Sequence, residues 1–331
     1  MSLRSTAGEL GERGLKAGLT WLSHRRALGR LATRVPITKP MVARFVVGQT
    51  LDEALVALGK LRAAGYATTV DVLGESVTAA DLATAAADRY EATIHALAER
   101  GLDRNVSLKL TQTGLDIDPD LCRATVERIF RAAAGVGAFV RIDMEDHTKT
   151  DRTLDLWRAV RPLNPASGVV IQAALRRSPA DVERLLAENA PVRLCKGAYN
   201  EPASLAFRER AAIDRAYLEL GVRLLRAGAR PAFATHDGRI IEQLIGFAER
   251  EGIGPDAYEF QMLNGVRRDL QAALLRRGFR VRVYVPYGTE WYPYFMRRMA
   301  ERPANVAFML RSVLKEGRSG RQAGGSSRHA G

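Results

Sequence analysis

Cysteine and histidine are scarce in this sequence, and their scarcity limits the chemistry that the chain can support. The 331 residues include 2 cysteines, Cys122 and Cys195, which stand far apart in segments expected to form a helix and a strand. Neither a disulfide framework nor a zinc cluster is indicated, which fits a reducing cytosol. None of the 5 histidines has a second histidine or cysteine at metal-ligand spacing, so we expect no metal centre.

Long apolar runs are absent as well. No segment approaches the roughly 20 apolar residues of a membrane span, and the N-terminus lacks the apolar region of a signal peptide. A hydrophobic content of 47% and a charged content of 26% are ordinary for a globular protein. We therefore expect a cytoplasmic protein with a sizeable buried core.

Blocks of consecutive basic residues are missing too, although the net charge is +13. Such a charge favours phosphate-rich partners or an anionic membrane surface. The arginines, however, are scattered among alanine, glycine and leucine, which is more typical of a compositional bias than of a binding surface. We expect no nucleic-acid partner; the alternative, a basic nucleic-acid-binding module, would form a salt-sensitive complex.

The two ends differ in composition from the middle. Residues 1–40 have helical periodicity with a basic polar side, which predicts a helical arm; Trp21 beside basic residues also suits a membrane-surface helix. Residues 316–331 are rich in glycine, serine and arginine and predict a disordered basic tail. The main domain is then expected over residues 41–315, and the basic ends suggest peripheral contact with the inner face of the plasma membrane.

Between the ends, short β-type apolar runs alternate with longer segments that have the i, i+3, i+4 apolar spacing of helices. The expected strands are residues 67–74, 105–110, 139–146, 168–175, 192–199, 231–237, 258–263 and 281–288. Eight strand–helix units in about 250 residues predict a (β/α)8 TIM-type barrel. A doubly wound open sheet is less favoured, because no glycine-rich phosphate loop follows the first strand.

Nearly every expected strand finishes in polar or ionisable residues. They are Asp71, Glu75, Lys109, Asp143, Glu145, Gln172, Arg193, Lys196, Thr235, His236, Glu259, Gln261 and Tyr284. A structural barrel can bury one or two ionic layers, so each residue alone is a weak signal. Catalytic groups collect at the C-terminal mouth of such barrels, and the set as a whole predicts an active site there.

Lysines and acids inside apolar strands must be paired or neutralised. Lys109 and Lys196 could serve as anion partners, flavin contacts or, as in an aldolase-type lyase, a Schiff-base nucleophile. Asp143 and Glu145 alternate with Met144, so both carboxylates are expected on one face. Two interpretations of these acids remain: they could be coupled carboxylates that bind metal or raise a pKa, or they could form an internal ion pair with Arg193 or a lysine.

The last strand is followed by WYPYFMRRMAERPAN, an expected helix with two adjacent arginines. Arg297 can share one helix face with Tyr294 and Glu301, and Arg298 stands beside it. Two guanidiniums suit a carboxylate ligand, which accepts parallel hydrogen bonds from the planar fork. A solvated face, with Glu301 neutralising one arginine, is the alternative.

Read together, these stretches resemble the proline dehydrogenase family of the monofunctional bacterial type. The matching motifs, in family order between about residues 41 and 310, are VSLKL, RIDMED, VIQAAL, VRLCKGAY, ATHD, YEFQML, RVYVPYG and YPYFMRRMAE. The resemblance implies a distorted (β/α)8 barrel with N-terminal helices and a last helix that caps the active site. It also implies oxidation of L-proline to Δ1-pyrroline-5-carboxylate, the first step of catabolism to glutamate, with hydride passing from C5 to N5 of non-covalent FAD and electrons passing on to a quinone.

Residue roles follow from the same resemblance. Asp143 is implied as the active-site acid, and Arg193 as the arginine near the reactive flavin nitrogen. Implied substrate contacts are Lys109, Tyr284, Tyr294, Arg297, Arg298, Glu301 and Glu75, the last as a partner of Arg297 at the entrance. Implied FAD contacts are Met144, Gln172, Arg193, Lys196, Gly197, Ala198, Tyr199, Thr235 and His236.

Overall fold

The computed structural model describes residues 44–301, with the side chains of 297–301 left out. The chain divides into two compact units, one spanning Val47–Thr289 and the other including the described segments Arg44–Val46 and Glu290–Glu301. The expected arm, residues 1–40, and tail, residues 316–331, lie outside the described residues, so these domain boundaries stay predictions.

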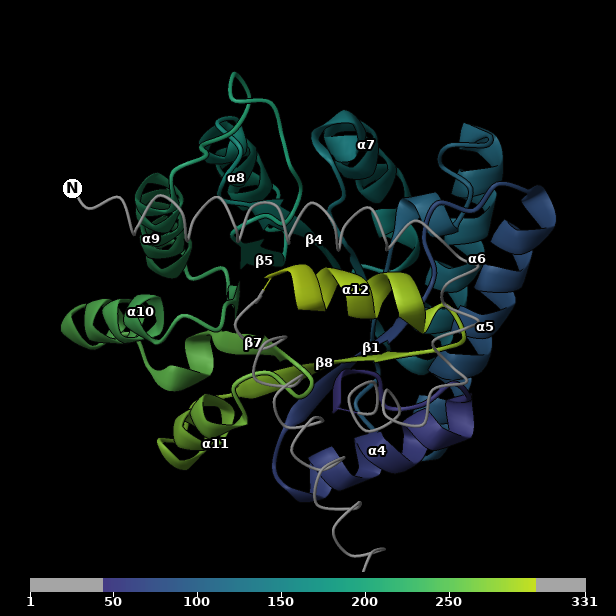
Figure 1. Cartoon of the computed structure of the whole chain (residues 1–331), viewed down its shortest axis with the longest axis horizontal. Coiled ribbons are helices and arrows are strands. Elements are labelled where there is room, and N and C mark those ends of the chain that lie inside the picture. Colours follow the sequence, from purple (N-terminus) through teal and green to yellow (C-terminus); the bar gives the residue numbers. More distant parts are fainter. Residues whose placement is uncertain (1–43, 302–331) are drawn as a thin grey trace, which may run out of the picture. The chain divides into compact units, whose positions relative to one another are not determined.

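The larger unit is a closed barrel of parallel strands in sequence order (Figure 1). Its strands are β1 (Ala67–Val72), β2 (Asn105–Leu108), β3 (Phe139–Ile142), β4 (Ser167–Gln172), β5 (Val192–Cys195), β6 (Ala232–Ala234), β7 (Glu259–Leu263) and β8 (Val281–Tyr287). β8 closes the barrel by pairing with β1 along the whole of β1. The predicted (β/α)8 barrel is confirmed.

Helices surround the strands (Figure 1). They are α4 (Leu51–Ala63), α5 (Ala80–Glu99), α6 (Pro119–Val136), α7 (Thr150–Val160), α8 (Ser178–Ala187), α9 (Arg210–Arg226), α10 (Gly238–Arg250) and α11 (Arg268–Arg276), with 3-10 turns at Leu110–Gln112 (η2), His147–Lys149 (η3), Arg161–Leu163 (η4) and Pro255–Ala257 (η5). In the smaller unit, α12 spans Trp291–Glu301. None of the helices between residues 44 and 301 combines the length and apolar character needed to cross a bilayer.

Buried aromatic side chains tie three helices to the strands beneath them. The Tyr90 hydroxyl on α5 donates to the Ser107 carbonyl at 2.8 Å, and the Tyr217 hydroxyl on α9 donates to the Leu194 carbonyl at 3.0 Å. The Trp157 indole on α7 donates to Ser167 Oγ at 3.2 Å. Each ring buries a large apolar area while its polar atom is satisfied, so the helices are fixed in orientation as well as in contact.

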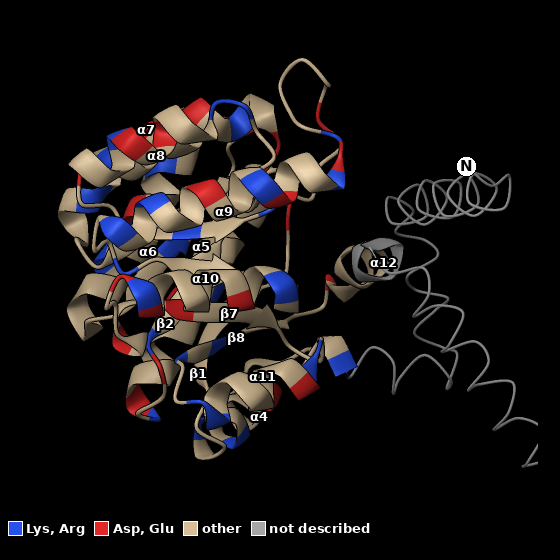
Figure 2. Ribbon diagram, turned by 90° about the vertical axis from the view of Figure 1, so that its left-hand side faces the viewer, with Lys and Arg blue, Asp and Glu red and all other residues tan. Residues whose placement is uncertain are grey.

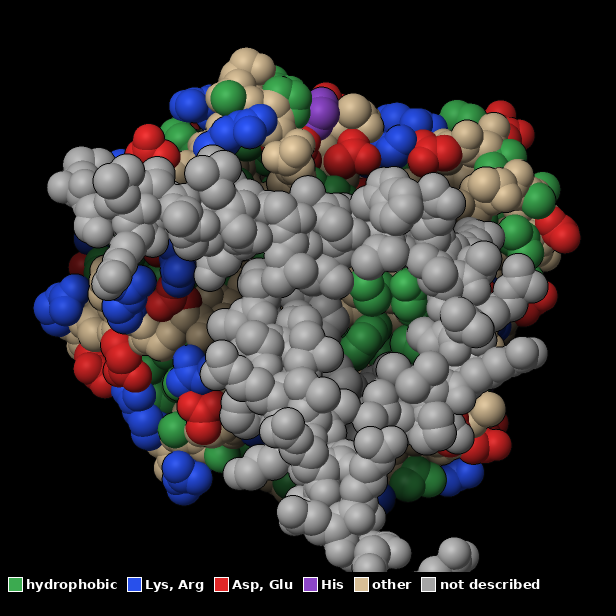
Figure 3. Space-filling model, viewed as in Figure 1, with side chains coloured by type: hydrophobic (Ala, Val, Ile, Leu, Met, Phe, Trp, Pro, Cys, Tyr) green, Lys and Arg blue, Asp and Glu red, His purple; other side chains and the backbone are tan. Residues whose placement is uncertain are grey.

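Ion pairs between neighbouring helices account for much of the surface charge. The pairs are Arg128–Glu91, Arg158–Glu188, Arg223–Glu183, Arg226–Glu251 and Arg277–Glu242. Figure 2 shows basic and acidic side chains intermixed along the outer helices, and Figure 3 shows the same mixture among the side chains coloured by type. Exposed pairs of this kind contribute about 0.2 to 1 kcal/mol each to the free energy of unfolding, so each one adds little to the stability of the barrel.

The strands end earlier than the sequence predicts. β3 ends at Ile142, β5 at Cys195 and β6 at Ala234. Directly after β3 and β5 a backbone bond to the neighbouring segment persists, from the Asp143 amide to the Leu108 carbonyl at 2.8 Å and from the Ala174 amide to the Lys196 carbonyl at 2.9 Å, and polar residues farther on take loop and cap hydrogen bonds. Asp237, for example, is the N-cap of α10 and accepts from the Arg239 amide at 3.1 Å. Some of the polar residues expected at strand ends are therefore the first residues of loops (Lys109, Asp143, Lys196 and Thr235), and others lie within strands (Asp71, Gln172, Arg193 and Tyr284).

A buried ionic layer lies at the opposite end of the barrel. Glu259, expected at a strand end, is instead the first residue of β7, so its prediction as a mouth residue is wrong. Its carboxylate accepts from Arg282 Nε at 2.8 Å and from Arg280 Nε at 3.0 Å. Burial alone would raise the pKa of Glu259, but the Arg282 guanidinium, helped by the hydrogen bond from Gln261 and by Arg141, lowers it to about 2.

Glu259→Gln should lower the free energy of unfolding at pH 7 by about 3 to 5 kcal/mol, because it removes the carboxylate 2.8 Å from the buried Arg282 guanidinium and leaves only Asp103, at 4.0 Å, as a charged partner. Since the folded-state pKa is about 2 against an ordinary 4.5, the stabilisation is present above pH 4.5 and is lost as pH falls towards 2. Chemical unfolding across this range measures the effect. The exposed Glu183→Gln serves as control, and an equal, pH-independent loss in both variants would contradict the assignment.

Candidate active site

The centre of the barrel mouth is an ion pair between β5 and the residue that follows β3. Arg193 Nη1 donates to Asp143 Oδ1 at 2.7 Å, and the two side chains are 6% and 14% exposed. The Tyr284 hydroxyl on β8 donates to the other carboxylate oxygen at 2.8 Å. The Arg193 guanidinium also lies 5.4 Å from the centroid of the Tyr284 ring, so the three side chains form one packed group.

The remaining nitrogens of Arg193 are held as well. Nε donates to the Gln261 side-chain carbonyl on β7, and Nη2 donates to Ser107 Oγ on β2 at 3.0 Å. Ser107 Oγ lies 3.4 Å from Thr69 Oγ1 on β1. Contacts from several strands thus fix a buried cation before any ligand arrives, which is the preorganisation that stabilises developing negative charge.

A second ion pair lies beside the first. Lys109 follows β2, and its ammonium lies 3.4 Å from both carboxylate oxygens of Asp71 on β1. Asp71 is completely buried; burial raises its pKa most, the Lys109 charge opposes that rise, and the Asp143 carboxylate adds to it. The prediction that an inward lysine must be paired is confirmed for Lys109.

Asp143 and Glu145 of the RIDMED motif do not act as a coupled pair. Glu145 accepts from the Thr111 amide at 3.0 Å and from the Thr111 hydroxyl, and burial is the main cause of its raised pKa. Asp143 instead binds Arg193 and Tyr284. The expectation of two carboxylates on one face is wrong because β3 ends at Ile142 and regular alternation stops there.

Lys196, just after β5, sits in a separate cluster of charges. Its ammonium binds Asp214 on α9 and, at 3.1 Å, Asp237 before α10. Arg210, at the start of α9, approaches Asp237 at 3.5 Å and Asp214 at 3.9 Å. A Schiff-base lysine must be free to attack a carbonyl carbon, and the Lys196 side chain is instead engaged by two carboxylates.

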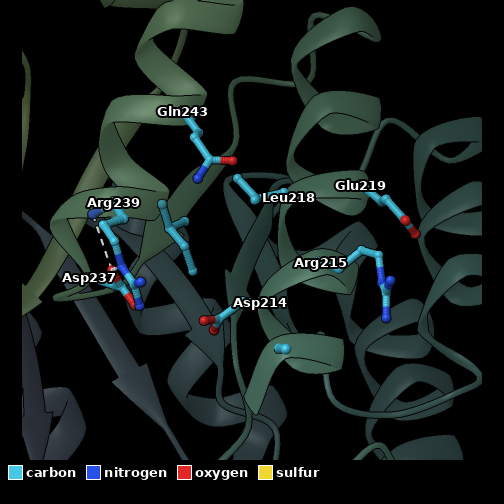
Figure 4. Close-up of a pocket in the computed structure, with 9 residues that line it drawn as sticks. Asp214, Arg215, Leu218, Glu219, Asp237, Arg239 and Gln243 are labelled. Atoms are coloured by element: carbon cyan, nitrogen blue, oxygen red, sulfur yellow. Dashed lines mark hydrogen bonds and ion pairs between the residues drawn. The ribbon is translucent and has the colours of Figure 1, made fainter. Parts of the chain in front are cut away.

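A cavity of about 410 Å³ adjoins this cluster (Figure 4). Its lining residues are Ala211, Asp214, Arg215, Leu218, Glu219, Asp237, Arg239, Ile240 and Gln243. Sequence reasoning missed Arg210 and Asp214, since both lie on a helix rather than at a strand end. Their i, i+4 spacing on α9 is the one signal that could have suggested them.

The other expected FAD contacts lie around the ends of β3, β4, β5 and β6. Gly197 has φ +105°, and a side chain there would meet Ala174 Cβ and Gln172 Oε1, each at 3.3 Å. The Gln172 amide donates to the Glu145 carbonyl at 2.8 Å, and His236 Nε2 accepts from the Leu263 amide at 2.9 Å. Of the rest, Met144 and Thr235 are buried, and Ala198 and Tyr199 are exposed. Their contacts with FAD stay predictions.

Expected substrate contacts outside the central group are only partly described. Glu75 lies in the loop between β1 and α5. Tyr294 is buried on α12, whereas the side chains of Arg297, Arg298 and Glu301 on the same helix lie outside the described part. A cap over the barrel and a grip on a carboxylate therefore stay predictions.

Comparisons with known proteins identify the family. The proline dehydrogenase family matches residues 54–311. Proline dehydrogenase of Deinococcus radiodurans is 41% identical over 280 residues, which cover 83% of this chain and 90% of that protein. The chain belongs to the proline dehydrogenase family. It is an oxidoreductase that oxidises proline to pyrroline-5-carboxylate, the first step of proline catabolism.

Further relatives agree with this assignment. Proline dehydrogenase 1 of Bacillus subtilis subsp. natto is 38% identical over 296 residues, covering 89% of this chain and 98% of that protein. The crystal structure of proline utilization A (PutA) from Bdellovibrio bacteriovorus, inactivated by N-propargylglycine, matches with a TM-score of 0.74 and 29% identity. That match covers 80% of this chain and 33% of the PutA chain, so this chain spans about a third of that structure.

Asp143→Asn should lower kcat/KM for proline about 100-fold, because the Arg193 guanidinium loses its counter-ion and can shift from its fixed position. Steady-state kinetics measures this loss. Asp151→Asn, which alters an exposed ion pair with Arg177, is the matched control and should retain activity. Equal activity of Asp143→Asn and the unchanged enzyme would contradict the role of the pair.

Proposed function

We propose that the enzyme binds FAD non-covalently at the barrel mouth and passes its electrons to a quinone. Bound FAD would supply the acceptor for the C5 hydrogen and two electrons of L-proline. The observation that carries the proposal is the Arg193 cation, held by Asp143, Gln261 and Ser107 at the mouth. A fixed cation favours an acceptor that becomes more negative as it is reduced.

The residues around β5 fit a dinucleotide. Gly197 lets the backbone run where a side chain would crowd Gln172. Lys196 and Arg210 offer two cations for a diphosphate, and the Arg210 side chain is 77% exposed with only long contacts to carboxylates. The adjoining cavity between α9 and α10 can receive the part of the cofactor beyond the diphosphate (Figure 4).

The substrate side is proposed to recognise the proline carboxylate through cations. Lys109 is held at the mouth by Asp71, and Arg297 and Arg298 supply the remaining charge-assisted hydrogen bonds. Tyr284 and Tyr294 would pack against the pyrrolidine ring, with Glu301 orienting the arginines and Glu75 pairing with Arg297 at the entrance. The carboxylate is the handle farthest from C5, so gripping it fixes the reacting atom.

Contact with a membrane is a separate proposal. The basic segments 1–40 and 316–331 would hold the enzyme peripherally at an anionic membrane, where a quinone is reached. Sedimentation with and without anionic lipid vesicles tests this proposal, and equal binding to neutral and anionic vesicles would contradict it.

Purified protein should carry FAD that is released on denaturation, and its visible absorbance should bleach when L-proline is added without oxygen. The oxidation of proline has no other electron acceptor under those conditions. Glycine, which lacks a C5 position, should leave the spectrum unchanged. Protein without flavin after expression in flavin-sufficient cells, or flavin that is indifferent to L-proline, would contradict the proposal.

Arg297→Met and Arg298→Met should each weaken proline binding by about 1.5 to 3 kcal/mol, because each removes a charge-assisted hydrogen bond to the carboxylate. The absorbance titration with proline gives the affinities. Arg123→Met, on the outer face of α6 where Arg123 pairs with Glu127, is the control and should bind proline normally. Unchanged affinity in both clamp variants would show that the carboxylate is held elsewhere.

A further inference from the structure

The loop between β5 and α9, residues 196–209, carries Lys196 and Gly197 and has almost no regular structure. Residues 197–200 are exposed, whereas Glu201 and Ala206 are buried. An irregular segment loses conformational entropy when it is ordered. Lys196 is anchored by its ion pairs with Asp214 and Asp237, and its carbonyl accepts from the Ala174 amide at 2.9 Å. Two further sets of contacts tie the rest of the loop to neighbouring elements.

The first set holds the second half of the loop against the segment after β4. Leu175 and Ala206 form an antiparallel bridge. The Arg176 amide donates to the Leu205 carbonyl at 2.9 Å, and the Phe207 amide donates to the Ala174 carbonyl at 2.8 Å. These bonds are between backbone atoms, so they specify the path of the chain but depend little on side-chain chemistry.

The second set is made by one side chain, Glu201. Its Oε1 accepts from the His147 backbone amide at 2.9 Å, and its Oε2 lies at hydrogen-bond distance from His147 Nδ1. The Glu201 side chain is 7% exposed and that of His147 is 31% exposed. Both carboxylate oxygens thus bind one residue, in η3 after β3; we name this contact the Glu201–His147 clasp.

The clasp has a cost that a plain loop would avoid. Burying a carboxylate is unfavourable unless hydrogen bonds and charge compensate it, and a solvent-exposed loop has no need of a buried acid. His147 is held in turn by η3, whose N-cap Asp146 accepts from the Thr148 amide at 2.9 Å. The clasp therefore joins an irregular loop to the η3 turn that follows β3.

We propose that Glu201 and His147 are positioning residues for the cofactor. Their clasp holds Glu201 against η3, so that the backbone of residues 197–200, between this contact and the anchored Lys196, stays placed to receive the FAD dinucleotide. This inference rests on the proposed binding of FAD and assigns no direct contact with FAD to either residue. Without the clasp, the ion pairs of Lys196 and the backbone bonds near Ala206 remain, but the loop loses the side-chain contact that ties Glu201 to η3.

The test measures how fast holoenzyme releases FAD after dilution, followed by the recovery of flavin fluorescence. Glu201→Ala should release FAD about tenfold faster, because hydrogen bonds to a charged group that order the bound state are lost. His147→Ala keeps the backbone amide bond to Glu201 Oε1 and should show a smaller increase, and the double variant should release FAD no faster than Glu201→Ala. His147→Asn keeps a side-chain N–H donor near the position of Nδ1 and should restore slow release.

The control is Glu183→Ala, which removes an exposed ion pair with Arg223 between α8 and α9 and should leave the release rate unchanged. Thermal unfolding in saturating FAD separates positioning from general stability. A merely structural role would lower the unfolding midpoint in the clasp variants and leave the release rate alone, and that result would overturn the inference. Failure of His147→Asn to restore slow release would overturn it too.

Failure of the inference and failure of the proposed function give different results. If unchanged protein binds FAD but Glu201→Ala releases it at the same rate as Glu183→Ala, the clasp has no role in positioning and the proposed function stands. If unchanged protein binds no FAD, the proposed function is overturned and this inference falls with it.

Discussion

The barrel mouth depends on one buried ion pair, Arg193 with Asp143. A guanidinium that is 6% exposed is tolerable only because each of its nitrogens has a partner, and those partners come from different strands. Removing any one of them leaves a buried charge or a buried polar group unsatisfied. The position of Tyr284 follows from the same pair, because its hydroxyl takes the carboxylate oxygen that Arg193 leaves free.

The segment after β3 connects this ion pair to the surrounding loops through its side chains. Asp143 faces the barrel interior, Glu145 binds the turn after β2, and His147 binds the loop after β5. Residues 143–147 therefore contact Arg193, the turn that follows Lys109, and the loop proposed to receive the FAD dinucleotide. Such a segment can do this because it is no longer a strand: once ladder pairing ends at Ile142, successive side chains are free to point to different elements.

The sequence predicts the fold well because strand and helix periods are local properties of the chain. Polar residues inside apolar runs stand out for a related reason, and the structure brings Asp143, Arg193 and Tyr284 together; their contacts with FAD and proline stay predictions. It fails where the answer depends on tertiary geometry. Glu259 lies at the wrong end of the barrel for a mouth residue. It is the first residue of β7, and the sequence does not show that its carboxylate pairs with Arg282 on β8. Arg210 and Asp214 were missed because a charged helix face looks the same whether it meets solvent or a cluster.

The central claim is that Asp143 and Arg193 act as one unit, and a double-mutant cycle on kcat/KM for proline tests it most directly. Asp143→Asn, Arg193→Gln and the double variant are compared with the unchanged enzyme under one set of conditions. If the pair is a unit, kcat/KM of the double variant is no lower than that of the less active single variant. Losses that multiply in the double variant would show that the two side chains act independently and would contradict the account.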